Sequence, residues 1–234
     1  ETTTKVSFTD GNTEFNTSGV QYIMNPYDEW YALVRAVELK EEVAGSKVTL
    51  INVGPASNDS ILRKGLAIGA DQALRVDGEP KSAYYTAAQI AKYAKGMDIV
   101  FTGKETIDYN GAEVGAILAE LLDVPFISFA VDLKVEGNVA TVTREIEGGK
   151  EIVKVQPPFV LSAAKGMAEQ RIPNMRGIMM AKKKPLVVRP AANMSDPVSI
   201  VNYELPAAKS AVKLIDPENM DELVRLLHEE AKVI

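Results

Sequence analysis

The first 125 residues alternate short apolar runs with stretches of helical spacing, and this alternation limits the possible folds more than any other feature. The runs "KVTLINV" (47–53), "ALRV" (73–76) and "MDIVFTG" (97–103) have the length and composition of buried strands. Each is followed by a segment with the periodicity of an amphipathic helix. Strands that alternate with helices predict parallel pairing through helical crossovers. We therefore predict an α/β fold with a doubly wound, mostly parallel sheet and helices on both faces.

Two loops follow these strands. One begins with Val53 and Gly54 in "VGPAS", and the other is "TGKETIDYNG" (102–111), which leads into a helix expected from about Ala112. Right-handed crossovers place both loops at one edge of the sheet, where open α/β sheets bind ligands. Small residues at the helix start leave its N–H groups uncovered, and these groups suit a phosphate. Neither loop has a Walker or dinucleotide glycine pattern, so a βα turn without a ligand is the alternative.

Three side chains are relevant to ligand binding at this edge of the sheet. Glu113 falls in the first turn of the expected helix, where a carboxylate stabilises the helix but repels a phosphate on the same amides. It must point away, or a cation must intervene, or the phosphate must lie elsewhere. In "MNPYDEW" (24–30), Asn25 precedes a proline and is held extended, and Tyr27 or Asp28 begins a helix. Asn25 and Tyr27 either line a cofactor or form a helix entry packed on the core.

The pattern changes after residue 125. Residues from about 126 to 160 alternate with period two around the turns "EGN" and "EGG", which predicts an antiparallel excursion of hairpins. Residues 165–185 lack periodicity, so we expect a long irregular loop. Its four methionines suit a protein-docking surface, and an ordinary surface loop is the alternative. Residues 186–216 predict an extended arm, and "DPENMDELVRLLHEEAK" predicts a final helix with Asp216 as its cap.

The composition excludes several functions. A net charge of −6, from 26 basic and 32 acidic residues, argues against a general nucleic-acid binder. With no cysteine, the chain has no disulfide, thiol catalyst or iron–sulfur cluster. The single histidine, His228, lies in a polar helical stretch and builds neither a triad nor a multi-histidine metal site. No apolar run approaches the roughly 18 residues of a membrane span and no signal peptide is visible, so we expect a bacterial cytoplasmic protein.

Five segments, taken in order, resemble the β subunit of electron transfer flavoproteins. They are "MNPYDEWYALVRAVELKE", "VGPASNDSILRKGLAIGAD", "GKETIDYNGAEVGAILAELLDVPFIS", "VTREIEGGKEIV" and "PNMRGIMMAKKKP". The resemblance covers nearly all of the chain. It implies a fold of the adenine-nucleotide α-hydrolase type and a heterodimer with an α subunit that holds most of the FAD. This chain then carries its own nucleotide, which is AMP in ordinary members and a second FAD in electron-bifurcating members.

The resemblance also implies a role. The complex passes electrons between acyl-CoA or other dehydrogenases, as in fatty acid oxidation, and a quinone reductase or ferredoxin. The chain is then an electron-carrier subunit and not an enzyme, because the flavin does the redox chemistry. It divides into a nucleotide-binding α/β domain at 1–185 and a C-terminal arm and helix at 186–234 that pack on the α subunit. Within the first domain, residues 165–185 match the recognition loop that docks on the dehydrogenase.

The residues that match the sites of the family follow from the aligned motifs. The nucleotide site is implied to comprise Asn25, Val53, Gly54, Thr106, Asp108, Ala112, Glu113 and Val114, and Tyr27 matches the aromatic residue that approaches the flavin of the α subunit. The docking region is implied to comprise Glu145 and the loop residues Ile172, Pro173, Asn174 and Met175, with Ile172 as the apolar anchor.

The chain departs from the family pattern in two places. At the helix start it reads "AEVG", where AMP-binding members read Asn-Gln-Thr-Gly and bifurcating members read Ala-Gln-Val-Gly. The preceding "YNG" replaces the Gly-Asp-Thr of the bifurcating type, so AMP and FAD both stay open and the incomplete bifurcating signature favours AMP. Family members also have a strand before the "ETTTK" position, in the middle of the sheet, and we expect that strand to be missing from this sequence.

A stand-alone adenine-nucleotide-binding regulatory protein of the same fold is the alternative function. It explains the two loops at the sheet edge. It leaves the hairpin excursion, the methionine-rich loop and the arm without a role.

Overall fold

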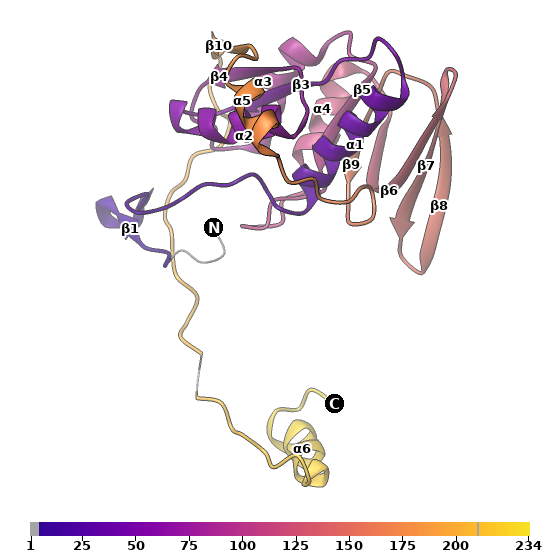
Figure 1. Ribbon diagram of the computed structural model, residues 1–234. Helices are drawn as coiled ribbons and strands as arrows, with labels where there is room; N and C mark the ends of the chain where they lie inside the picture. Colours follow the sequence, from indigo (N-terminus) through magenta and orange to yellow (C-terminus); the bar gives the residue numbers. More distant parts are fainter. Residues whose placement is uncertain (1–4, 210) are drawn as a thin grey trace.

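The computed structural model describes residues 5–209 and 211–234 (Figure 1). The stretch "ETTT" (1–4) and residue 210 of the expected arm lie outside the described residues. The main body is a layered α/β structure in which helices cover parallel strands, which confirms the predicted fold class. A small hairpin lies to one side, and an arm runs from the body to a separate terminal helix.

The elements follow the alternation read from the sequence. In chain order they are β1 (Phe8–Thr9), η1 (Asp10–Asn12), β2 (Glu14–Phe15), α1 (Asp28–Glu42), β3 (Thr49–Val53), η2 (Ala56–Asn58), α2 (Asp59–Ile68), β4 (Gln72–Asp77), α3 (Ala83–Ala94), β5 (Ile99–Gly103), α4 (Val114–Leu122), β6 (Phe126–Glu136), β7 (Val139–Ile146), β8 (Gly149–Val155), β9 (Phe159–Ala163), α5 (Met175–Ala181), β10 (Leu186–Pro190), α6 (Met220–Arg225) and the π-helical turn η3 (Leu226–Glu230).

The strands of the body form two sheets. One has the order β10-β4-β3 and is parallel throughout. The other has the order β5-β9-β6-β7-β8, with β9 parallel to both β5 and β6. Its outer strands β6, β7 and β8 are antiparallel, as the period-two pattern predicts. In β6 the register with β9 shifts between Ile127 and Ala130, and Phe129 in this stretch has a φ of 55°. At this irregularity β6 changes from pairing with its parallel neighbour β9 to pairing with its antiparallel neighbour β7.

A cavity separates the two sheets. Within the described residues, β3 pairs only with β4 and β5 pairs only with β9, so each has one edge without a strand neighbour. The cavity has a volume of about 710 Å³, and its walls include both strands and side chains from α1, α2, α3 and α4. The central strand that the family resemblance implies was expected to be missing from this sequence, and the cavity occupies the space between the two free edges.

Helix α1 links the two halves of the body. Its residues Ala32 and Leu39 belong to the buried cluster of β6, β7 and β9, whereas Leu33, Val34 and Val37 belong to the cluster around α2. Val34 and Val37 are each only 1% exposed. Burial of both faces explains why this helix is apolar around much of its circumference, and it holds the two sheets in one body.

Four sequence expectations need correction. The loop expected at 165–185 contains the helix α5. The side chain of Asn174 caps this helix by accepting a hydrogen bond from Gly177 N. Gly177 also allows α5 to approach α2 closely, because a Cβ at this position would lie 2.5 Å from the main-chain oxygen of Ala67. The strand β9 is parallel and central, although the excursion was expected to be antiparallel throughout.

The other two corrections concern helix starts. The final helix begins at Met220 and not after Asp216, because Asn219 accepts the capping bond from Glu222 N at 3.2 Å. Asp216 instead accepts from Glu218 N in the preceding turn. Helix α4 begins at Val114, two residues later than expected, because Asn110 and Ala112 are left-handed and prolong the loop.

Residues 186–190, the first of the expected arm, form β10 and pair with β4. None of the helices in the described part of the chain has the length and apolar character to span a bilayer.

Candidate functional site

The loop between β5 and α4 forms a structured turn at the carboxyl edge of its strand. The amide of Asn110 donates to the oxygen of Thr106 at 2.9 Å, and the amide of Asp108 donates to the hydroxyl of Thr106 at 3.3 Å. Asn110 and Ala112 both have a φ of 54°. The chain therefore turns twice through the left-handed region before α4 starts, which is uncommon for residues other than glycine and indicates a loop of defined shape.

The entry to α1 holds this loop in place. The side-chain amide of Asn25 donates to the main-chain oxygen of Glu105 at 2.9 Å, and its side-chain oxygen accepts from Tyr27 N at 3.0 Å. Asp28 accepts from the amide of Glu105 at 3.2 Å. Asn25 and Asp28 are both buried, so these bonds are shielded from water. The segment before α1 and the loop after β5 consequently form one unit.

Carboxylates crowd this edge of the cavity. Burial raises the pKa of Asp28, although the Glu105 amide and the charge of Lys104 act against it. Glu29 is exposed to the cavity, and its pKa is raised, chiefly by desolvation within the surrounding body and against the bond from the Asn25 amide. The pKa of Glu105 is lowered, because its carboxylate bonds Lys104 Nζ at 2.6 Å. The Lys104 ammonium is thus already paired within the loop.

The loop after β3 is held by a buried arginine. Arg75, on β4, is 4% exposed, and it donates to the oxygen of Gly54 at 2.9 Å and to Asp59 at 2.7 Å. A third bond goes to the carboxylate of Asp77 at 2.5 Å. A Cβ at Gly54 would lie 2.2 Å from the side-chain nitrogen of Asn58, so a larger residue there would displace that side chain. This guanidinium therefore ties β4, the loop and the start of α2 together.

The structure brings most of the expected nucleotide-site residues to one place. Of the nine expected cofactor-binding residues, eight for the nucleotide and Tyr27 for the flavin, seven line the cavity: Asn25, Val53, Thr106, Asp108, Ala112, Glu113 and Val114. The two others, Gly54 and Tyr27, belong to the adjoining loops and do not line it. Tyr27 is 55% exposed. Glu113 stands at the N-cap position of α4 and is exposed, so the carboxylate expected to oppose a phosphate is close to the helix start.

The docking residues expected from the sequence do not line the cavity, and the loop that carries most of them is held against α1 and the segment before it. Ile172 is 84% exposed and Met175 is 73% exposed. The loop is fixed to α1, because Arg171 makes two bonds to Glu41 at 2.7 and 3.1 Å and its oxygen accepts from the indole of Trp30 at 3.3 Å. An exposed apolar surface on a fixed support is a suitable shape for protein contact.

Glu145, the other expected docking residue, ends the strand β7 in an exposed position. Its negative charge contributes to the raised pKa of Lys104, whose main cause is the bond to Glu105. Lys104 also lies over the ring of Phe129, with Nζ 5.6 Å from the ring centre. Glu145 is therefore electrostatically close to the β5–α4 loop.

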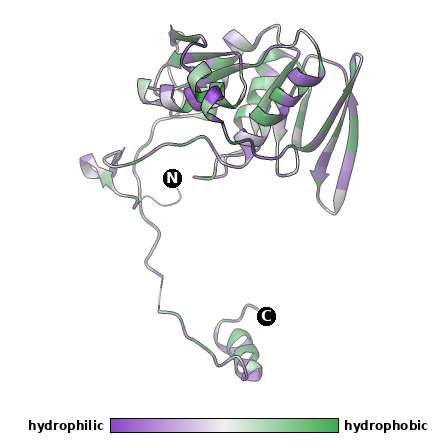
Figure 2. Cartoon of the chain, viewed as in Figure 1, coloured by the Kyte–Doolittle hydropathy of each residue, from purple (hydrophilic) through white to green (hydrophobic). Residues whose placement is uncertain are grey.

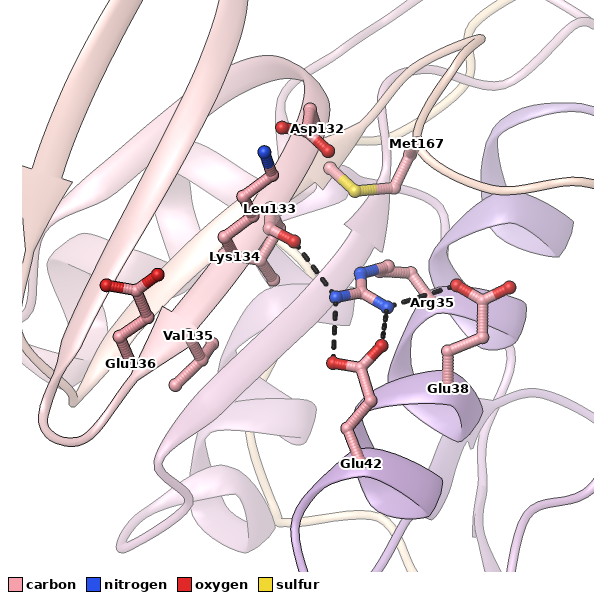
Figure 3. Close-up of a pocket in the computed structure, with 9 residues that line it drawn as sticks. All are labelled: Arg35, Glu38, Glu42, Asp132, Leu133, Lys134, Val135, Glu136 and Met167. Carbon is pink, nitrogen blue, oxygen red and sulfur yellow. Dashed lines mark hydrogen bonds and ion pairs between the residues drawn. The ribbon is translucent and has the colours of Figure 1, made fainter.

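A second, shallow cleft lies between α1 and β6 (Figure 3). Its centre is Arg35, which bonds both Glu38 and Glu42 and donates to the main-chain oxygen of Leu133 at 2.9 Å. Burial alone lowers the pKa of Arg35, but the bonds to Glu42 and Glu38 raise it overall. Both terminal nitrogens of this guanidinium are bonded to protein oxygens, so the cleft has the character of a packing contact.

Sequence reasoning missed Asp28, Arg75 and Arg171, which hold the loops. Charged residues in a helix, a strand and a loop carry no local signal of a long-range contact, and their partners become visible only in the fold. Among the described residues, no group of three or more histidine, aspartate or glutamate side chains could hold a metal ion.

These features define a class of protein: an α/β body whose loops after β3 and β5 converge on one cavity, with a C-terminal arm that extends away from the body (Figure 1). The family model "Electron transfer flavoprotein domain" matches residues 13–194, so the chain belongs to the electron transfer flavoprotein family. Within that family it groups with proteins named "Electron transfer flavoprotein subunit beta".

Three of these relatives come from distant organisms. The protein of Bacillus subtilis (strain 168) is 36% identical over 232 residues, covering 92% of this chain and 90% of the relative. That of Megasphaera elsdenii is 39% identical over 181 residues, covering 72% and 67%. That of Homo sapiens is 33% identical over 229 residues, covering 93% and 88%. Membership of the family implies association with flavin and electron transfer.

Proposed function

We propose that the chain binds an adenine nucleotide at the edge formed by the loops after β3 and β5, within a heterodimer whose α subunit holds most of the FAD. The carrying observation is that seven of the nine expected residues converge on one cavity at that edge. The N–H groups at the start of α4, together with its dipole, favour a phosphate there. We propose AMP, with a second FAD of the bifurcating type as the alternative.

The chain itself shields and positions the flavin. Tyr27 supports this role, since it is 55% exposed beside the loop and its ring is available to a neighbouring chain. The redox chemistry then belongs to the isoalloxazine ring, and the residues of this chain act by binding and by excluding water. In this proposal the subunit is an electron carrier with no bond-making catalytic residue of its own.

We further propose that the surface around α5 docks a dehydrogenase. Ile172, Met175 and Met179 are 84%, 73% and 66% exposed, and flexible thioethers adapt to partners of different shape. Acyl-CoA or other dehydrogenases would supply the electrons, and a quinone reductase or ferredoxin would accept them, in the bacterial cytoplasm. Glu145 would assist from the side of the β5–α4 loop.

The domain boundary expected after residue 185 falls before β10, which pairs with β4 in the body, so we propose that the part of residues 186–234 that packs on the α subunit is the arm and helix after β10. Figure 2 shows apolar positions along the arm as it leaves the body. Val201, Val212 and Leu214 are 82%, 84% and 89% exposed. Apolar side chains so fully open to water on an extended segment are typical of a surface that a partner covers.

The part of the cavity that lies between β3 and β5 supports a central strand as part of the same proposal, and the nucleotide is proposed to lie beside the loops that follow these two strands. An extended segment placed there would satisfy the backbone groups of both free edges and bury the apolar walls. Amide hydrogen exchange checks this in the working complex. Slow exchange of Thr49–Val53 and Ile99–Gly103, equal to that of Gln72–Asp77, is expected, and fast exchange at both free edges would contradict it.

Mass spectrometry of the ligand released from the co-purified heterodimer tests the proposed function. One AMP and one FAD per heterodimer is the expected result. Two FAD identify the bifurcating type, and a complex without adenine nucleotide in this subunit rejects the proposal. Gel filtration tests the regulatory alternative: a chain that binds nucleotide but elutes unchanged after mixing with the α subunit supports it.

A further inference from the structure

We propose that the N-terminal hairpin, residues 8–15, is a clasp that holds the C-terminal arm at Tyr203 and sets the path of the arm before the partner subunit binds. The ring of Tyr203 stacks on that of Phe8 with centroids 5.0 Å apart and planes 11° from parallel. The amide of Tyr203 also donates to the oxygen of Asn12 at 2.7 Å. Opposite ends of the chain thus meet through one ring contact and one backbone bond.

The hairpin depends on an additional surface. Its two strands pair only Phe8 with Phe15 and Thr9 with Glu14, extended by a bond from Asn16 N to Ser7 O at 3.0 Å. An isolated hairpin of this length is marginal in water. In Figure 1 it lies apart from the body and beside the arm. The arm therefore supplies the surface on which the hairpin packs, and the hairpin in turn holds the arm.

Tyr203 is the last attachment of the arm. Nearer the body, Ala192 exchanges two hydrogen bonds with Gln89, and Asp196 accepts from Lys81 N and Ser82 N at 2.9 Å each. After residue 203, the hydrogen bonds of the described residues join only residues within the arm and the terminal helix. The clasp thus extends the fixed part of the arm from residue 196 to residue 203.

This attachment matters for association. Ordering a free backbone costs conformational entropy, and a segment held beforehand does not incur that cost at binding. Val201 and Leu205 flank the clasp and are 82% and 54% exposed. Holding Tyr203 therefore presents these apolar side chains in a defined place to the α subunit, a consequence that rests on the proposed heterodimer.

Hydrogen exchange on the free full-length chain tests the clasp without the partner. The peptide that contains Tyr203 should be protected in the natural chain and in Tyr203→Phe, which keeps the ring. Its exchange should be at least about tenfold faster in Phe8→Ala and in Tyr203→Ala. Peptides from β4 serve as the internal control and should not change. Equal exchange of the Tyr203 peptide in the natural chain and in Phe8→Ala would overturn the proposal.

Titration with the α subunit tests the consequence. Phe8→Ala and Tyr203→Ala should each weaken association about tenfold, and the double variant should be no weaker than either single variant, because both remove the same contact. Unchanged affinity in the single variants would refute the role in association. If the natural chain itself does not bind the α subunit, the proposed heterodimer fails, whereas the exchange result still decides whether the clasp exists.

Discussion

Asn25 donates a hydrogen bond from its side-chain amide to the main-chain oxygen of Glu105 at 2.9 Å, across 80 residues of sequence. The bond joins the segment before α1 to the loop after β5, and it uses the amide nitrogen that was expected to line a cofactor. Asn25 therefore shapes the proposed site by holding its loop. The buried position of the side chain makes the bond a defined structural link.

Replacement of Asn25 tests this link. Asn25→Ala removes the bonds to Glu105 O and Tyr27 N and should lower nucleotide affinity roughly tenfold, the equivalent of about 1.4 kcal/mol. Calorimetric titration of the heterodimer with nucleotide measures the change. Asn219→Ala, which removes a cap on the distant α6, is the matched control and should bind as the natural chain does. Equal affinities in both variants would contradict the assigned role.

Glu113→Gln should tighten nucleotide binding several-fold. The change removes a negative charge at the N-cap of α4, where the phosphate is proposed to lie, and the gain should shrink as salt rises. Glu120→Gln makes the same change of charge in the last turn of the same helix and should leave affinity unaltered. Weaker binding by Glu113→Gln, measured at low salt, would place the carboxylate among the groups that hold the ligand.

Arg75→Met should destabilise the body. The side chain is 5% exposed, and its loss leaves Asp59 and the oxygen of Gly54 without a donor. Leaving a buried hydrogen-bonding group without its partner costs about 1–3 kcal/mol of folding free energy. Because the carboxylates bound by Arg75 are partly exposed to water, we expect a cost at the lower end of this range. The melting temperature should fall by roughly 2–4 °C per kcal/mol, together with nucleotide affinity. Arg225→Met, in an exposed cluster on α6, should leave both nearly unchanged.

The pH dependence of stability should differ in sign between two neighbouring glutamates. The pKa of Glu29 is raised by desolvation, so its ionised form opposes folding at neutral pH and the penalty vanishes as the pH falls below the unfolded pKa. Glu29→Gln should therefore melt at a higher temperature than the natural chain at pH 7, and the two curves should converge near pH 4.

Glu105 should behave in the opposite way. Its pKa is lowered by the bond to Lys104, so its ionised form stabilises the fold above the unfolded pKa and loses this effect as the pH falls. Glu105→Gln should melt below the natural chain at pH 7 and match it in acid. Calorimetric scans at both pH values measure the two variants together, and shifts of the same sign in both would refute the assignment.

Ile172→Glu should slow electron transfer from the cognate dehydrogenase roughly tenfold or more. The side chain is 84% exposed, so the charge costs little in the free protein but is buried when a partner docks. Flavin content and melting temperature should be unchanged. Val139→Glu, at the other end of the β7 strand from Glu145, is the control and should transfer electrons normally. Loss of flavin in Ile172→Glu would make the residue structural.

The local sequence pattern was sufficient to predict much of the fold of this protein. The alternation of strands and helices predicted the class of fold, and the period-two stretch predicted the hairpin of β6, β7 and β8, because side-chain periodicity follows directly from backbone geometry. The same pattern located both loops at the sheet edge, and the motifs within them identified the family. The start of α4 was misplaced because Asn110 and Ala112 adopt left-handed conformations that no local pattern predicts, whereas the caps Asn174 of α5 and Asn219 of α6 were present in the sequence and were overlooked.

The tertiary structure alone decided how distant segments meet. Three hydrogen bonds join residues that are far apart in the chain: Asn25 to Glu105, Arg75 to Gly54 and Tyr203 to Asn12. No residue spacing in the sequence predicts these bonds. Only the fold also showed that the parallel strands form two sheets with a cavity between β3 and β5. Periodicity reports which face of an element is buried, whereas the partner on that face depends on how all the elements pack together.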